Sequence, residues 1–349
     1  MASRVYLAEA RSEVRAGLNP ETFHRVQLSI IIVNWKSKDY LRKCVASVFA
    51  QTSGIDFETV VIDSASFDGA GEMLAKEFPK VRFIQSEDNL GFSKANNRAF
   101  EDSTGDVVLF LNPDTELVCN AINTLLDAMK TLLDAGAVGC KLLNTDGSIQ
   151  TSCVQAYPTI LNQVLSADAF RRMTPNSSLW GMRAILEASP KPQIVEMISG
   201  ACLMMRRDVF KKIGQFSTEY FMYAEDVDLC FKAQQAGYRN YYCSEAVVIH
   251  HGGGSSQQAR SNFSSIMMIE SISQFLKKTR GGVYSLCYRM VLGLSALMRV
   301  MVLVVLSPII LLKNGSARWS SACSKWWAIF RWGFGLSRWA KQFQSTTSV

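Results

Sequence analysis

Runs of apolar, β-branched residues alternate with helical patterns over the first third of the chain. The apolar runs lie at residues 28–33, 57–63, 81–85 and 106–111. Between them, apolar residues at helical spacing predict helices near 41–49, 69–78 and 93–101. Strands that alternate with helices of about ten residues predict right-handed βαβ units. We therefore expect an α/β fold with a mostly parallel, Rossmann-like sheet flanked by helices.

Polar residues stand directly after each of these expected strands. They are Asn34, Asp63, residues 86–89 and residues 112–114. In an open α/β sheet, ligands bind at the carboxyl ends of the strands. We expect these residues to line one binding site.

The alternation stops after residue 150. Residues 151–192 contain four of the eight prolines and few periodic runs, so we expect a long loop region that serves as a lid or an acceptor surface. Order returns in a strand-like stretch at 194–205, a helix from about 225 to 235, and strands near 238–242 and 246–249.

Two polar motifs could bind a nucleotide. Asp63 at a strand end could accept the imide N–H of a uracil or thymine ring, or it could simply be a polar strand end. Gly91 and Lys94 stand near an expected helix N-terminus, which suits a diphosphate. A helix cap without a ligand explains most of this second pattern.

Asn112-Pro-Asp114 follows the apolar strand at 106–111. A carboxylate at this place could hold Mg²⁺ or Mn²⁺, hard cations that bind oxygen and bridge phosphates. Asn-Pro-Asp is also ordinary turn chemistry, so the motif alone favours a turn.

Three carboxylates, Glu225, Asp226 and Asp228, stand at an expected helix start. Acidic residues in a first turn stabilise the helix dipole without any catalysis. The apolar, aromatic approach at 221–224 additionally suggests a partly buried base with a raised pKa. His250 and His251 follow an apolar strand; either is a packed residue or, together with Asp114, part of a metal site.

The order of these blocks is more specific than any one of them. They read VNWKSKDYL, VVIDSASFDG, NLGFSKANN, LFLNPDTEL, SGACLMMRRDVF, FMYAEDVDLC and HHGGGSS. This series, over about residues 28–256, resembles the inverting family 2 glycosyltransferases of the GT-A fold, especially their rhamnosyltransferase-like branch.

The resemblance implies a donor site. Asp63 would bind the pyrimidine, with Asn34 nearby. Gly91, Lys94 and Asn96 would line the diphosphate. The implied donor is dTDP-rhamnose or a UDP-sugar.

The resemblance also implies a metal site for Mg²⁺ or Mn²⁺. Asn112 stands where many relatives have Asp, so Asp114 is the expected direct ligand and Asn112 acts through water. His250 matches the metal-ligating histidine, with His251 as the alternative.

The remaining implied roles concern the acceptor. Asp226 matches the general base, Glu225 is its neighbour in the acceptor site, and Gly200 falls where acceptor and donor sugar meet. Asp226 would take the proton from an acceptor hydroxyl, which attacks the anomeric carbon opposite the leaving diphosphate and inverts it. The acceptor is expected to be a polyprenyl-linked or other glycan in cell-surface polysaccharide synthesis.

Charge separates the tail from the rest of the chain. All 30 acidic residues lie at or before Glu270, and the tail from Ser271 on has 11 Lys and Arg residues. Since the tail is also strongly apolar, we expect it to meet anionic lipid and not nucleic acid.

We expect three parts in the chain: a lead-in at 1–27, a catalytic domain at 28–270 and a membrane-associating helical tail at 271–349. Within the catalytic domain, we expect a nucleotide-sugar half at 28–150 and an acceptor half at 151–270.

Residues 290–312 are long and apolar enough to span a bilayer. Arg299 and Pro308 argue against an ordinary span. Five of the seven tryptophans then lie among basic residues at 318–341, which is typical of an interfacial helix. A monotopic or re-entrant anchor is favoured over a true span, and both over a soluble partner-binding tail.

Two further sequence features bear on location. The first 20 residues lack an apolar run, so no secretory signal peptide is expected. The nine cysteines show no metal-ligand spacing, which favours reduced thiols in the cytoplasm. We expect a peripheral or monotopic protein on the cytoplasmic face of the cell membrane.

Two rival functions use similar features. A nucleotidyltransferase would show a Gly-rich basic loop after the first strand, where VNWKSKDYL stands instead. A non-catalytic homologue would lack some of Asp114, Asp226 and His250, which are all present. The donor sugar, the acceptor and the linkage are not encoded in any motif.

Overall fold

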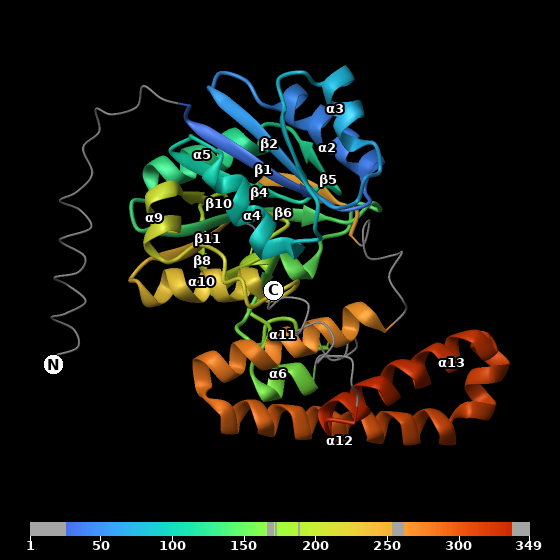
Figure 1. Ribbon diagram of the computed structural model, residues 1–349. Helices are drawn as coiled ribbons and strands as arrows, with labels where there is room; N and C mark the ends of the chain where they lie inside the picture. Colours follow the sequence, from blue (N-terminus) through green and yellow to red (C-terminus); the bar gives the residue numbers. More distant parts are fainter. Residues whose placement is uncertain (1–25, 166–170, 172, 188, 253–261, 337–349) are drawn as a thin grey trace, which may run out of the picture. The chain divides into compact units, whose positions relative to one another are not determined.

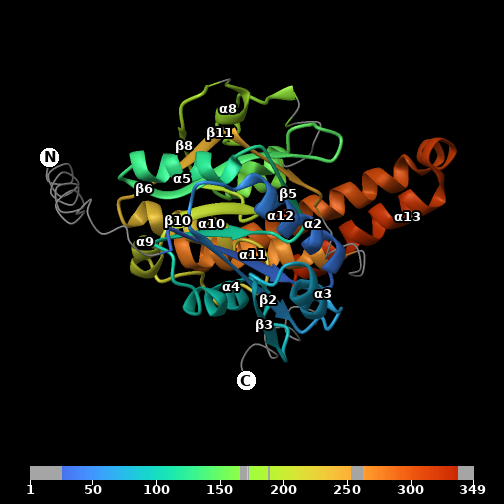
Figure 2. The ribbon, with the colours of Figure 1, turned by 90° about the horizontal axis from the view of Figure 1, so that it is seen from above.

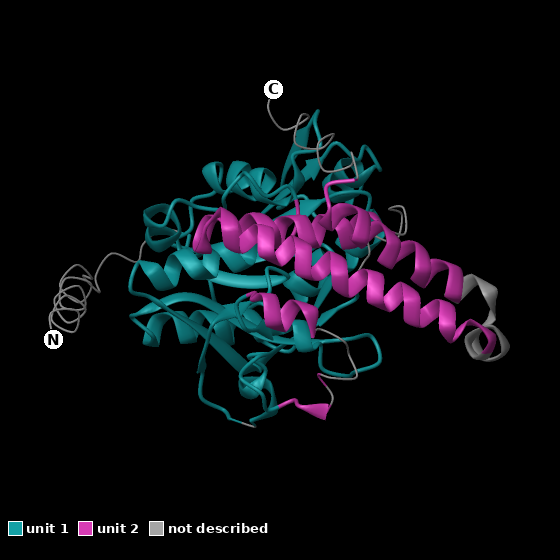
Figure 3. Cartoon of the chain, turned by 90° about the horizontal axis from the view of Figure 1, so that it is seen from below, with its two compact units in different colours: residues 1–157, 176–221, 225–255 teal, residues 158–175, 222–224, 256–349 magenta. Residues whose placement is uncertain are grey.

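The computed structural model describes residues 26–165, 171, 173–187, 189–252 and 262–336, with the backbone alone over 309–318. Most of the expected lead-in, residues 1–25, lies outside these. The chain divides into two compact units, coloured separately in Figure 3. Unit 1 comprises 1–157, 176–221 and 225–255, and unit 2 comprises 158–175, 222–224 and 256–349.

The first half of the unit 1 sheet is parallel, as expected, in the order β3-β2-β1-β4. Its strands are β1 (Leu28–Asn34), β2 (Phe57–Ser64), β3 (Arg82–Ser86) and β4 (Val107–Leu111). The helices between them are α2 (Lys38–Gln51), α3 (Ala70–Glu77) and α4 (Gly91–Glu101). The inner residues of β1, β2 and β4 form apolar runs because helices cover both faces of the sheet.

The second half of the sheet is mixed, so the expectation of a mostly parallel sheet is wrong there. Its strands are β5 (Thr115–Val118), β6 (Ala135–Leu143), β10 (Cys202–Arg206) and β11 (Arg239–His250). β10 runs antiparallel to both β4 and β6, and β11 is parallel to β6 but antiparallel to β5. A strand covered on both faces is an apolar run whichever way its neighbours point, so the sequence pattern could not reveal the direction.

Two stretches differ in detail from the sequence expectation. The strand-like stretch at 194–205 is broken into β8 (Gln193–Val195), β9 (Met197–Ile198) and β10, and β9 pairs with β7 (Val154–Gln155). The two strands expected near 238–242 and 246–249 form the single strand β11, whose register shifts between Cys243 and Val247.

Helices cover both faces of this sheet (Figures 1 and 2). The elements not yet named in unit 1 are α5 (Ala121–Thr131), η1 (Thr151–Cys153), α8 (Arg183–Leu186), α9 (Arg207–Lys212) and α10 (Glu225–Gln235). Aliphatic residues of α2, α3 and α5 share one core cluster with β1, β4 and β6. On the other face, four aromatic rings pack together, those of Phe100, Phe110, Phe210 and Phe216.

Unit 2 is helical and contains α6 (Ile160–Val164), α11 (Phe263–Arg280), α12 (Gly282–Val305) and α13 (Ser307–Gly333). Gly281, with a φ of 90°, separates α11 from α12. α12 and α13 approach closely at Gly293 and Gly333, where a Cβ on Gly333 would lie 2.9 Å from the Gly293 Cα. By length and composition, α12 is the one described helix that could cross a membrane, and only 22% of its most apolar window is buried.

Candidate functional site

Five donors surround the carboxylate of Asp63 at the end of β2. Asn34 Nδ2 donates to Oδ1 at 2.6 Å, and the Ser66 hydroxyl donates to the same oxygen. The backbone N–H groups of Ser66 and Phe67 donate to Oδ2 at 3.0 and 3.3 Å, and Gln85 Nε2 donates to it at 2.8 Å. Parallel pairing puts Asn34 in register with Asp63, so the two side chains expected at the pyrimidine ring are brought together.

These hydrogen bonds decide the charge of Asp63. The residue is 1% exposed, and burial alone would raise its pKa. The hydrogen bonds from Ser66, Gln85 and Asn34 outweigh burial and lower the pKa below its usual value, so the carboxylate is ionised at neutral pH. Of the three side chains that donate to Asp63, that of Gln85 belongs to an exposed residue. A ligand that reaches Asp63 from solvent would therefore replace the Gln85 amide.

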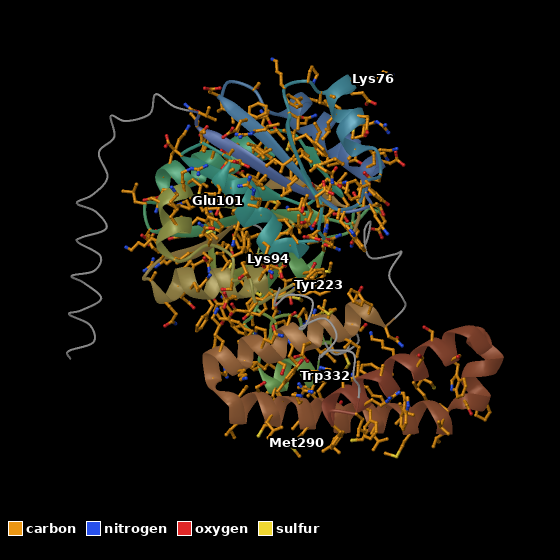
Figure 4. The ribbon with its side chains drawn as sticks, in the orientation of Figure 1. Lys76, Lys94, Glu101, Tyr223, Met290 and Trp332 are labelled. Carbon is orange, nitrogen blue, oxygen red and sulfur yellow. The ribbon has the colours of Figure 1, made fainter. Side chains whose placement is uncertain are left out.

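The first turn of α4 approaches the backbone of Phe221 very closely. Gly91 has a φ of 66°, and a Cβ there would lie 2.4 Å from the Phe221 carbonyl oxygen. The same oxygen accepts the N–H of Phe92 at 2.9 Å, so the position requires glycine. Lys94, labelled in Figure 4, is half-buried on this turn. Asn96 is buried, and its Nδ2 donates to the Phe92 carbonyl at 3.0 Å; its contact with a diphosphate stays a prediction.

Asp114 and His250 face each other beyond the ends of β4 and β11. Asp114 Oδ1 lies 3.3 Å from His250 Nε2, and Asn112 Nδ2 lies 3.5 Å from the same nitrogen. Antiparallel pairing of β11 with β5 puts His250 in register with Thr115. The three residues expected at the metal are thus brought together by the second half of the sheet.

Gln150 sets the tautomer of His250. Its Nε2 donates to the His250 carbonyl, so its Oε1 is an acceptor and lies 2.9 Å from the ring Nδ1. In a neutral ring the proton is therefore on Nδ1, and Nε2 presents its lone pair to Asp114. Such a lone pair and a carboxylate oxygen at 3.3 Å repel each other unless a proton or a metal cation lies between them.

This donor set suits a divalent cation. Carboxylate and amide oxygens are ligands of Mg²⁺ and Mn²⁺, and imidazole is compatible with Mn²⁺. Over the described residues, no group of three or more His, Cys, Asp or Glu side chains is arranged to hold a metal ion by itself. Magnesium is usually held by one or two carboxylates plus substrate phosphates, so Asp114 and His250 would share such an ion with a bound phosphate.

His251 contacts Glu116 and Tyr40 with its side chain. Its Nε2 lies 2.7 Å from Glu116 Oε1, and its ring centroid lies 5.2 Å from that of Tyr40. Its backbone N–H donates to the Asp114 carbonyl at 2.9 Å. Of the two histidines, the geometry favours His250 as the ligand.

Asp226 is held by two backbone N–H groups at the start of α10. Gly200 donates to its Oδ2 at 2.9 Å, and Val227 donates to its Oδ1 at 2.8 Å. Burial nevertheless raises the pKa of this partly exposed carboxyl above its usual value. Gly200, expected where acceptor and donor sugar meet, and Asp226, expected as the general base, are thus in direct contact.

Glu225 and Asp228 have different surroundings. Glu225 is buried, and its Oε2 has no hydrogen-bond partner among the described atoms. Burial, together with the charge of Asp226, raises its pKa well above its usual value, which favours the protonated form. Asp228 accepts the Ser217 hydroxyl at 2.5 Å and lies 3.6 Å from Lys232 Nζ, which makes it a structural residue of the fold.

The segment 200–201 joins these two groups of side chains. The Ala201 carbonyl accepts the Asn112 N–H at 2.9 Å, while the adjacent Gly200 N–H binds Asp226. The connection follows from the antiparallel pairing of β10 with β4, which puts Cys202 in register with the last residue of β4. Two consecutive residues, Gly200 and Ala201, therefore link the carboxylate of Asp226 to the backbone of the Asn112–Asp114 turn.

Sequence reasoning missed Gln85 and Gln150. Gln85 reaches Asp63 because β2 and β3 pair in register at these two residues. Gln150 follows Ile149, which forms an isolated bridge with Leu143. Neither glutamine stands in a motif, so only the strand register and the loop path could have revealed them.

Several known proteins are similar to this chain. The family model for glycosyl transferase family 2 matches residues 29–214. An N-acetylglucosaminyl-diphospho-decaprenol L-rhamnosyltransferase of Mycobacterium tuberculosis is 31% identical over 234 residues, which cover 63% of this chain and 75% of that protein. The rhamnosyltransferase WbbL of Escherichia coli K12 is 23% identical over 222 residues, 61% of this chain and 79% of that protein.

One solved structure resembles nearly the whole chain. It is a mannosyltransferase from Pyrobaculum calidifontis in complex with GDP-Man and Mn²⁺, with a TM-score of 0.55 and 17% identity. The match covers 97% of this chain and 94% of that one. At this identity the likeness concerns the fold.

Proposed function

The chain belongs to glycosyl transferase family 2, and we propose that it transfers a hexose from a nucleoside diphosphate to a lipid-linked glycan with inversion at the anomeric carbon. The observation that carries this proposal is the link through residues 200–201. It connects a carboxylate of raised pKa, Asp226, to the turn that carries Asp114. A single displacement at a sugar carbon requires a base near the attacking hydroxyl and a group that stabilises the negative charge of the leaving diphosphate. This link would hold both near one substrate.

In the proposed reaction, Asp226 is the general base. The N–H groups of Gly200 and Val227 fix its two oxygens, so the remaining lone pairs have a defined direction toward an acceptor hydroxyl. Asp226 takes the hydroxyl proton as the oxygen bonds to the anomeric carbon, and the bond from that carbon to the diphosphate oxygen breaks on the opposite side. The raised pKa brings the base closer to the working pH, which favours proton transfer.

Glu225 would act beside this base as a neutral group. A protonated carboxyl group can donate a hydrogen bond to an acceptor oxygen while leaving the only negative charge on Asp226. This role uses the buried carboxyl whose Oε2 has no partner among the described atoms.

Asp114 and His250, with Asn112 directly or through water, would hold the divalent cation. When bound, Mg²⁺ or Mn²⁺ offsets the negative charge that develops on the leaving diphosphate. Gln150 keeps the His250 proton on Nδ1 and so leaves Nε2 available as a ligand.

The remaining donor contacts belong to the first half of the sheet. We assign the pyrimidine to Asp63 with Asn34, and the diphosphate to Gly91, Lys94 and Asn96. The division into a donor half at 28–150 and an acceptor half at 151–270 follows from these assignments. The charge of Lys94 would complement a phosphate, and the absence of a Cβ at Gly91 keeps α4 against its neighbouring loop.

The Mycobacterium tuberculosis and Escherichia coli relatives are named as rhamnosyltransferases, and the former name includes a decaprenol-linked acceptor. We therefore propose L-rhamnose as the transferred sugar, from dTDP-rhamnose or with a UDP-sugar as the alternative donor. A polyprenyl-linked acceptor would lie in a membrane, so we also propose a peripheral or monotopic location on the cytoplasmic face of the cell membrane.

A donor screen tests this function. Purified full-length protein is incubated with dTDP-rhamnose, UDP-sugars and GDP-sugars, Mn²⁺ and a short-chain prenyl-diphospho-N-acetylglucosamine. We expect transfer from one donor class and a product whose anomeric configuration, measured by NMR, is opposite to that of the donor. Retention of configuration would overturn the proposed mechanism, and absence of transfer from every donor would overturn the substrate assignment.

A further inference from the structure

The exposed side of α12 in unit 2 is entirely apolar. Every exposed residue between Gly282 and Val305 is Gly, Cys, Val, Leu or Met. The exposed side chains repeat at spacings of three or four residues along the helix, as in Val283, Leu286, Met290, Leu294, Met298 and Met301. We call this row, from Val283 to Val305, the apolar stripe. A helix that faces water carries polar residues at such positions.

The two charged side chains of α12 point the other way. Arg289 lies 3.6 Å from Glu270, donates to the Trp332 carbonyl at 2.9 Å and stacks on the Trp332 ring. Arg299 donates to the Val164 carbonyl at 2.8 Å and lies over the Trp326 ring, with its guanidinium carbon 4.2 Å from the ring centroid. Both arginines are therefore turned into unit 2.

Figure 4 shows the same division with two labelled residues. Met290 lies on the outer side of α12, and Trp332, which is fully buried against Tyr288, lies on the inner side. The helix thus has its charges inside the unit and its apolar residues outside, the reverse of a soluble amphipathic helix.

The charge of unit 2 identifies the occupant of this stripe as lipid. No Asp or Glu follows Glu270 in the sequence, while Lys277, Lys278 and Arg280 are exposed at the end of α11. These basic residues complement anionic headgroups. A second copy of the chain would instead bring like charges against each other.

The stripe is also long for a protein contact. It spans 23 residues from Val283 to Val305 with no exposed polar residue, and the 22 steps between its ends, at 1.5 Å each, give roughly 33 Å. This length is close to the thickness of the hydrocarbon core, so length alone does not distinguish a helix that lies on a bilayer from one that crosses it.

The surroundings of α12 make that distinction. α13 packs along it, with contacts from Gly333 near one end to Trp319, whose Nε1 donates to the Leu303 carbonyl at 3.0 Å. A crossing α12 would carry α13 with it, including the exposed charges of Lys325 and Arg331, into hydrocarbon. Charged side chains there are strongly disfavoured.

We infer that α12 lies parallel to the membrane surface, with the apolar stripe in the acyl boundary and its arginine side turned to the rest of unit 2. This inference rests on and deepens the proposed function, because it would hold the protein at the surface where a lipid-linked acceptor lies, but the geometry of α12 stands without it. Such an in-plane helix binds through one apolar side only.

Depth measurements test the orientation. The exposed or partly exposed thiols are removed first, by Cys119→Ser, Cys287→Ser and Cys323→Ser. Single labelling sites for a nitrobenzoxadiazole probe are then introduced at three points of the stripe, by Val283→Cys, Leu294→Cys and Val305→Cys. Each labelled full-length protein is bound to vesicles of phosphatidylcholine and phosphatidylglycerol whose bromines lie near the headgroup or near the chain ends.

Equal quenching of all three probes by the shallow bromines, with weak quenching by the deep ones, is the expected result. Deep quenching at Leu294 with shallow quenching at Val283 and Val305 would mean that α12 crosses the bilayer. Probes that become buried without lipid, in a species of twice the mass, would mean that a second copy covers the stripe. Either of these results overturns the inference.

A pair of charge variants separates this inference from the proposed function. Met290→Glu with Met298→Glu should reduce flotation with anionic vesicles by about tenfold or more, whereas Leu133→Glu, at an exposed apolar residue of unit 1, should not. Transfer to a water-soluble acceptor should be unchanged in both. Unchanged flotation of the double variant would overturn the inference. If the wild-type protein itself transfers no sugar to the water-soluble acceptor, that result would count against the proposed function alone.

Discussion

The backbone N–H of Gly200 binds Oδ2 of Asp226 at 2.9 Å, and a Cβ added to Gly200 would lie 3.3 Å from the Asp226 Cβ. The carboxylate proposed as the base is thus held by backbone N–H groups. Any residue larger than glycine at 200 would press on the carboxylate that it orients. The predictions below begin with that carboxylate.

Asp226→Asn should lower kcat by roughly 10²–10⁴-fold, because the amide cannot accept the acceptor proton. Donor binding, measured by calorimetry with the nucleoside diphosphate and Mn²⁺, should change little. Asp208→Asn is the matched control, since Asp208 stands in the first turn of α9 and its side chain is 69% exposed. A turnover near that of the wild type in Asp226→Asn would remove this residue from the mechanism.

Glu225→Gln should stabilise the protein increasingly as the pH rises. The folded pKa of Glu225 lies well above its usual value of 4.5, so its stabilising contribution is complete below that value and is lost as pH rises toward the folded pKa. Glutamine stays neutral, so its advantage should grow by at most about 1.4 kcal/mol per pH unit within this window. Thermal unfolding of both proteins, measured at a series of pH values from about pH 4 upward, gives the difference.

Glu101→Gln serves as the control for this effect, because the Glu101 side chain is 61% exposed. Its stability relative to the wild type should show little dependence on pH over the same range. A difference between Glu225→Gln and the wild type that stays constant with pH would mean that Glu225 does not titrate with folding.

Metal binding should depend on His250 and not on His251. Treatment with EDTA should abolish transfer, and Mn²⁺ or Mg²⁺ should restore it. His250→Gln and Asp114→Asn should each weaken Mn²⁺ binding to the protein–nucleoside diphosphate complex by roughly 100-fold. Loss of a residue that only hydrogen-bonds to a metal ligand costs about 10–100-fold, and loss of a ligand should cost at least as much. His251→Gln should leave that affinity unchanged, since His251 pairs with Glu116; full activity in chelator would disprove the metal site.

Gln150→Leu should weaken the same Mn²⁺ affinity by about 10–100-fold without removing a ligand. The reason is that His250 Nδ1 then loses its acceptor at 2.9 Å and the ring can adopt the other tautomer. Gln150→Glu keeps an acceptor at this place and should retain most of the affinity. Equal losses in the two variants would show that Gln150 matters for packing and not for the tautomer.

Gly91→Ala should be more destabilising than Gly147→Ala, although both glycines have positive φ, of 66° and 80°. An alanine at 147 meets nothing within 4 Å, so only the left-handed backbone lowers its free energy of unfolding, by about 1–2 kcal/mol. At Gly91 the Phe221 carbonyl must also move, which adds about 1–3 kcal/mol. Chemical denaturation of both variants gives the comparison, and equal losses would contradict the close approach seen at Gly91.

The sequence pattern predicted the first half of the sheet well, because each strand there pairs with parallel neighbours through a short helical crossover. It also located α10 at Glu225–Gln235. It failed at β10, where an apolar run gave no sign that the strand inserts antiparallel between β4 and β6. Direction is a property of the connections, and those after residue 150 have no periodicity.

The candidate site shows the same limit at the level of side chains. Asp63, Asp114 and Asp226 stand in motifs and could be chosen from the sequence. Their roles, as nucleotide partner, metal ligand and general base respectively, remain predictions. Gln85 and Gln150 could not be chosen, because they reach the site only through strand register and an irregular segment. Residues that orient others need only the right position, so no local pattern marks them.

The Gln85 amide donates to Asp63 at the place that we assign to the pyrimidine. For a pyrimidine bound as proposed, its ring N–H would take over the position that the Gln85 N–H now holds at 2.8 Å. Exchanging one such hydrogen bond for another adds little to affinity. A ring that offers an acceptor in that position would leave the buried carboxylate facing a lone pair, and such mismatches are strongly rejected. The site would thus distinguish bases sharply while holding the right one only loosely, which suits an enzyme that must release its nucleotide after each transfer.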